Sequence, residues 1–133
     1  MGYKNMGYKV DIALVIDATG SMGPIIEELK ENPFIFSERL TEIMDGYYKP
    51  LDKLRMRIID FADFLSEGKE AIHASRFYDI PAEKEQFASR MREIQYDGRG
   101  SDEPENALEA LWTAMQSDWV DLHGATRGYH III

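Results

Sequence analysis

Residues 10–22, VDIALVIDATGSM, contain the strongest fold signal in the sequence. Residues 12–16 are apolar without interruption, which is typical of a strand whose two faces are both covered. Two glycines follow, and Pro24 then supplies a backbone angle that suits the start of a helix. The sequence therefore predicts a buried strand, a tight turn and a helix that begins within residues 22–24.

After Pro24, apolar side chains recur three and four positions apart, which predicts a helix with one buried stripe. Pro33 interrupts the pattern and predicts a kink or a split in this helix, which ends before Pro50. The stripe consists of Ile25, Leu29, Phe36, Leu40, Ile43, Met44 and Tyr47.

The rest of the chain predicts three more strands and two more helices. The strands alternate in polarity or are continuously apolar, and the helices carry apolar residues at helical spacing. A hairpin loop joins the second and third strands, so this pair is antiparallel. We expect the methionines and tryptophans of the helix stripes to pack in the core. In chain order, the segments are a strand at 54–64, a hairpin loop at 66–69, a strand at 71–77, a helix after Pro81, a helix near Pro104 and a strand at 129–133.

Composition indicates a single globular domain and limits its function. The chain has 133 residues, of which 44% are hydrophobic and 29% are charged, so one core is expected. A formal net charge of −9 disfavours nucleic acid and anionic membrane surfaces as partners and favours a cation. The sequence contains no cysteine, which removes thiolate chemistry. With neither a signal-like N-terminus nor a long apolar run, we expect a cytoplasmic location and no membrane anchor.

The candidate site lies in the turn after the first strand. Asp17, Thr19 and Ser21 stand two residues apart, so one carboxylate and two hydroxyls can converge in a tight turn. Hard oxygen ligands of this kind suit Mg²⁺, Mn²⁺ or Ca²⁺. A second loop, rich in glycine and acidic residues, contains Asp102, which can supply a fourth oxygen. The competing interpretation is that these residues only cap helices, Asp102 together with Glu105.

At these residues the sequence resembles the von Willebrand factor type A (VWA) domains. The segment DATGSM, residues 17–22, is similar to their metal-ion-dependent adhesion site, D-x-S-x-S, in which Thr is commonly allowed at the middle position. Gly100, Ala107 and Leu108 fit the family's second loop, G-x-T-x-T-G-x-A-L, and Asp102 stands where the family's first Thr coordinates the metal. The run GSDEPENAL resembles a bacterial branch of the family with a G-D-x-P-E form in this loop.

The resemblance implies a fold, a metal ion and a partner. The fold is a Rossmann-like, mostly parallel sheet with helices on both faces and strand order 3-2-1-4, the third strand being antiparallel at the edge. Residues 1–133 would form one such domain without the last third of the family's fold, since the sequence stops inside an apolar strand. A bound Mg²⁺, Mn²⁺ or Ca²⁺ ion would take an acidic residue of a protein partner, so binding rather than catalysis is expected. The fourth strand would be an open edge that favours self-association.

An enzyme is the second class of function. Asp17 at a strand end, followed by Thr19 and Gly20, faintly resembles the D-x-D-x-T loop of haloacid-dehalogenase-like phosphohydrolases, in which the first Asp is the nucleophile. That family has a second Asp at the position of Thr19, which acts as acid and base. The sequence therefore disfavours this alternative.

Other polar residues give weaker signals. Asp60 and Asp63 lie near the end of the second strand, and Asp63 can accept a hydrogen bond beside the metal turn, although an exposed strand-end position is the simpler expectation. The histidines lack metal-ligand spacing and are expected on strands or at the surface: His73, His123 and His130.

Overall fold

The computed structural model describes residues 7–18, 24, 27, 30–32, 35–61, 72–94, 104–122 and 127–133. This part of the chain forms an α/β arrangement with a mixed sheet of five strands and with three helices. None of the helices in these ranges is long and apolar enough to cross a membrane. The elements are β1 (Tyr8–Asp17), α2 (Ile35–Gly46), β2 (Leu51–Phe61), β3 (Ile72–Ala74), β4 (Tyr78–Ile80), α3 (Lys84–Arg92), α4 (Pro104–Met115) and β5 (Arg127–Ile132).

β1 lies in the middle of the sheet, whose order is β3-β2-β1-β5. It pairs in parallel with β2 on one side and with β5 on the other, so the carboxyl ends of these three strands point the same way. The predicted buried first strand is confirmed, because Val10, Ile12 and Ala13 are at most 1% exposed. The antiparallel edge is also confirmed, but it consists of two short strands instead of one.

A bulge at Ser75 separates β3 from β4. Ser75 donates its backbone N–H to the carbonyl of Ile58 (2.8 Å), and its Oγ accepts the N–H of Ile58 (2.9 Å). The hydroxyl thus takes the place of a carbonyl in the ladder. Further on, Tyr78 is opposite Met56, so two residues of the edge face one residue of β2 between these pairs. The predicted single strand over 71–77 is therefore wrong at this point.

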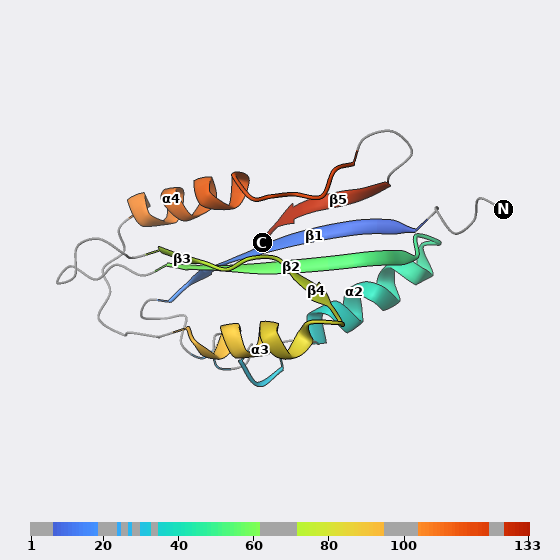
Figure 1. The fold of residues 1–133 in the computed structure, drawn as a ribbon, viewed down its shortest axis with the longest axis horizontal. Coiled ribbons are helices and arrows are strands. Elements are labelled where there is room, and N and C mark those ends of the chain that lie inside the picture. The colour runs from blue at the N-terminus through green and yellow to red at the C-terminus, as the bar shows by residue number, and fades with distance from the viewer. Residues whose placement is uncertain are drawn as a thin grey trace.

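Helices cover both faces of the sheet (Figure 1). On one face, α2 and α3 pack over a core that includes Ile12, Met56 and Phe87. On the other face, α4 places Ala110 and Ala114, both fully buried, against the sheet. Because side chains alternate along a strand, odd-numbered residues of β1 such as Ala13 face α4, and even-numbered ones such as Ile12 face the other core.

The helix stripes predicted from spacing are only partly buried. The predicted interruption at Pro33 agrees with Asn32, which is non-helical between helical Glu31 and α2. Met44 is buried as expected, but Ile43 and Tyr47 of the same stripe are 57% and 73% exposed. In α4 the expected core residues Trp112 and Met115 are also mostly exposed. These predictions are wrong, since the helices meet the sheet along a strip narrower than their apolar faces.

Candidate functional site

Asp17 is the last residue of β1 and lies at the carboxyl edge of the sheet. Its register partner is Phe61, the last residue of β2, and the next N–H along, that of Ala18, donates to the Phe61 carbonyl (2.8 Å). The ladder is thus intact to the end of β1, and Ala18 is 1% exposed. Asp17 itself is half-buried and belongs to the strand face that α4 covers.

The order of the strands in the sheet reverses at β1. From β1 the chain passes through α2, on one face, to β2 on one side of β1. It later passes through α4, on the opposite face, to β5 on the other side of β1. In open α/β sheets, ligands bind beyond the carboxyl ends of strands at such a switch point. α4 runs back from this edge, and its first turn lies at the same end as the carboxyl ends of β1 and β2 (Figure 1). Asp17 therefore occupies the position in which this topology favours a ligand.

Only one of the four predicted metal ligands is within the described residues. Asp17 lies at the carboxyl end of β1. Thr19, Ser21 and Asp102 lie outside the described residues, and so does Asp63. Among the described residues, no three His, Asp or Glu side chains gather as a metal site would require. The donor set itself, one or two carboxylates with two hydroxyls, has the hard-oxygen chemistry that Mg²⁺ and Mn²⁺ accept.

A second aspartate of β1 has a different setting. Asp11 is 1% exposed and faces the same side of the sheet as Asp17. Its carboxylate accepts two hydrogen bonds from Arg55 (Nε at 2.8 Å and Nη2 at 2.5 Å) and one from the N–H of Val120 (2.6 Å). Hydrogen bonding to Asp11 raises the pKa of Arg55. This carboxylate ties β1 to β2 and to the segment after α4, which is a structural role.

Asp60 is a buried carboxylate one residue before the carboxyl end of β2. It is 6% exposed and accepts a hydrogen bond from Arg90 Nη2 of α3 (2.6 Å), with His73 Nδ1 at 3.5 Å. Asp60 is therefore buried and paired, whereas Asp63, for which an exposed strand-end position is the simpler expectation, lies outside the described residues. His73 and His130 lie exposed on β3 and β5, as predicted, whereas His123 lies outside the described residues.

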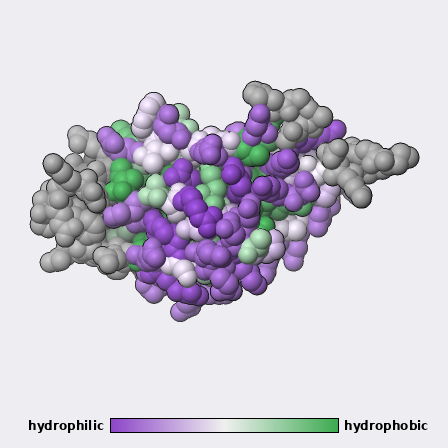
Figure 2. Space-filling model, in the orientation of Figure 1, coloured by the Kyte–Doolittle hydropathy of each residue, from purple (hydrophilic) through white to green (hydrophobic). Residues whose placement is uncertain are grey.

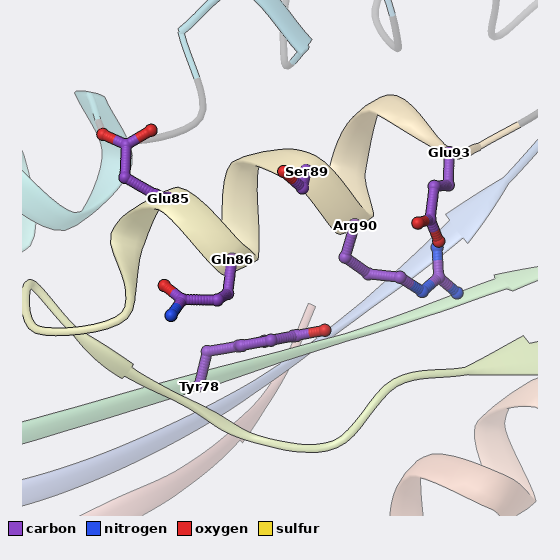
Figure 3. Close-up of a pocket in the computed structure, with 6 residues that line it drawn as sticks. All are labelled: Tyr78, Glu85, Gln86, Ser89, Arg90 and Glu93. Atoms are coloured by element: carbon purple, nitrogen blue, oxygen red, sulfur yellow. The ribbon is translucent and has the colours of Figure 1, made fainter.

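A pocket of about 290 Å³ lies on α3, next to this ion pair (Figure 3). Figure 3 shows the Tyr78 ring lying below the helix, with Arg90 and Glu93 together at one end of the pocket and Glu85 at the other. None of the predicted site residues lines it. Since Arg90 is already engaged by Asp60, the pocket offers acidic groups and no unshared cation.

The sequence interpretation missed both buried ion pairs. Asp11 and Arg55 are register partners across β1 and β2. Their pairing depends on the register between the two strands, which cannot be determined from the sequence alone. A usable signal was present, because an acidic residue stands within one apolar strand and Arg55 and Arg57 stand within the next. Opposite charges in neighbouring buried strands favour an ion pair over two separate charges.

Comparison with known proteins gives no family assignment. A scan against protein-family models produced no match, and a search of curated proteins produced none either.

Proposed function

We propose that this chain is a metal-dependent protein-binding module of the VWA type, with a Rossmann-like fold. The observation that carries the proposal is the place of Asp17, a half-buried carboxylate at the carboxyl end of the central strand, where the winding of the sheet reverses. Thr19 and Ser21 of the DATGSM segment, residues 17–22, would supply the hydroxyls.

In this proposal Asp17, Thr19 and Ser21 hold one Mg²⁺ or Mn²⁺ ion, and Asp102 adds a fourth oxygen from the loop before α4. The bound ion would supply an open position for a carboxylate of a protein partner. The chain's own contribution is to fix Asp17 through the β1–β2 ladder, which ends in the Ala18 to Phe61 hydrogen bond. The net charge of −9 attracts the cation and disfavours anionic polymers as ligands.

A cytoplasmic location accompanies this proposal. It is supported by the absence of cysteine from the sequence, since a chain that needs no disulfides suits a reducing compartment.

A manganese titration of the whole chain tests the proposal. We expect saturable binding at one site by calorimetry and by water-proton relaxation, and we expect Asp17→Ala to abolish it. Asp45→Ala is the matched control, because it removes an exposed carboxylate from α2 with the same change of net charge. Equal binding by the wild type and by Asp17→Ala would contradict the proposed site.

A second measurement separates binding from catalysis. The phosphohydrolase alternative requires Mg²⁺-dependent hydrolysis of an aryl phosphate that is lost in Asp17→Asn. The binding-module proposal expects no turnover above the level of the variant. Turnover that disappears with Asp17 would replace the proposal with the enzyme.

A further inference from the structure

A cavity of about 440 Å³ lies between α2 and the turn that leads from β4 into α3. It opens over the amino-terminal part of β2, at the end of the sheet opposite to Asp17. Figure 1 shows α2 beside the end of β4, where the cavity is formed. Its volume is within the range of about 300–1,000 Å³ that small-molecule pockets occupy. The cavity is therefore large enough for a small ligand and separate from the candidate metal site.

The floor of this cavity is apolar. Leu54 is 4% exposed and belongs to the core under α2 and α3, and Leu51 and Ile80 pack against that core while they stay half-buried. Leu54 and Ile80 are register partners, so β2 and β4 present them side by side. Figure 2 shows mostly hydrophilic residues over the neighbouring α3. Covering the apolar floor with an alkyl chain is favourable, because apolar surface is removed from water.

The mouth of the cavity is acidic. Glu38 of α2 and Asp52 of β2 line it and are exposed. Within the described part of the chain, neither carboxylate forms an ion pair, and no basic side chain lines the cavity. Lys53, the neighbour of Asp52, is paired with Asp79 (3.7 Å) instead. Gly7 lies against the Asp52 side chain so closely that a Cβ at Gly7 would collide with the Asp52 Cβ. The mouth thus offers two carboxylates, one of them held in place, and lacks a cation.

We propose that this cavity binds a small aliphatic primary amine in its ammonium form. The alkyl chain lies on Leu51, Leu54 and Ile80. The ammonium group stays at the mouth, where its three N–H donors face Glu38 and Asp52. Lysine side chains divide themselves in the same way, with a buried stem and a charge in water. A carboxylate or phosphate on an alkyl chain of equal length is rejected by the two like charges.

An NMR titration of the isotope-labelled whole chain with butyl-, pentyl- and hexylammonium, in the presence of EDTA, tests the proposal. We expect one saturable site, with shifts confined to the residues around the cavity and a Kd that falls about fourfold with each added methylene. Glu38→Gln/Asp52→Asn should weaken hexylammonium binding roughly fivefold or more. Thr41→Trp, which fills the mouth from α2 without a change of charge, should abolish binding. Glu109→Gln/Asp118→Asn is the matched control, because it removes the same two charges from exposed positions in and after α4, on the opposite face of the sheet, and should leave binding unchanged.

Several outcomes would overturn the inference. Hexanol binding as tightly as hexylammonium would leave the carboxylates without a role, and equal losses in the two double variants would mean attraction by net charge alone. Tighter binding of Nα-acetyl-lysine amide than of pentylammonium would make a lysine side chain of a partner the occupant. The absence of saturable binding by a wild-type chain that circular dichroism shows to be folded would reject the site. None of these measurements depends on a metal ion, so they are independent of the proposed function.

Discussion

Two aspartates of β1, six residues apart on the same face of the strand, have opposite settings. Asp11 lies mid-strand at 1% exposure, where Arg55 and Val120 donate three hydrogen bonds to its carboxylate. Asp17 lies at the strand's carboxyl end and is half-buried. The difference shows that residue type and strand face do not determine the role of a carboxylate. Its place along the strand also matters, because Asp11 is enclosed mid-strand whereas Asp17 borders the carboxyl edge, where ligands of open α/β sheets bind.

The largest expected effect is on the Asp11 side of this comparison. Asp11→Ala leaves Arg55 without its partner in a largely buried setting, and we expect it to lower the free energy of unfolding by about 3–5 kcal/mol. Urea denaturation followed by circular dichroism measures this loss. A loss of less than about 1 kcal/mol would mean that the Asp11–Arg55 pair behaves as an exposed one and would remove the contrast with Asp17.

A smaller loss of stability is expected for Asp60, which lies nearer to the carboxyl edge. Asp60→Ala removes the acceptor for Arg90 (2.6 Å), and we expect a loss of about 2 kcal/mol, the value of a hydrogen bond between charged groups. Arg90→Met serves as the matched variant from the other side of the pair. If Asp60→Ala also abolished manganese binding while the chain stayed folded, Asp60 would belong to the candidate site.

Asp17→Ala should change stability least among the three aspartate variants. We expect a change of less than about 1 kcal/mol in the free energy of unfolding, in spite of the loss of metal binding proposed above. The same urea titration, run without added metal, gives the number. A loss comparable to that of Asp11→Ala would assign Asp17 a structural role and break the comparison.

The smallest effect concerns a surface carboxylate and its pH dependence. The Arg76 guanidinium, and then the N–H of Asp79, donate hydrogen bonds to Glu83 and lower the pKa of Glu83. A lowered pKa in the folded state contributes stability above the unfolded value, near 4.3, and that contribution is lost as the pH falls through the folded pKa. Between pH 7 and acidic pH, the melting temperature of the wild type should therefore fall slightly more than that of Glu83→Gln. An identical fall in both would contradict the prediction.

The sequence predicted the central strand and its flanking elements because their signals are local. An unbroken apolar run predicted β1, and prolines marked the starts of α3 and α4 closely. Burial was predicted less well. Spacing shows which side chains share a helical face, but not whether that face meets another element, so Tyr47 and Trp112 were wrongly assigned to the core.

The sequence predicted the location of the candidate site but not the contacts of the charged residues around it. Asp17 at a strand end followed from the order of apolar and polar residues. The ion pair between Asp11 and Arg55 did not, because it depends on the register between two strands separated by more than thirty residues. The bulge at Ser75 also escaped prediction, since it depends on one hydroxyl meeting one particular N–H.

The bulge at Ser75 also lets one sheet edge supply both cores. Ile72 of β3 packs into the α4-side core, whereas Tyr78 of β4 packs into the core under α3. These residues are six apart, so in an unbroken strand they would point to the same face. Regular pairing of all these residues without the bulge would turn the Tyr78 ring away from Phe87, its edge-to-face neighbour, whereas deleting one residue between them would leave both side chains on their present faces. Over evolutionary time, this short edge should therefore either keep the bulge or lose one residue together with it, while its exposed positions change identity.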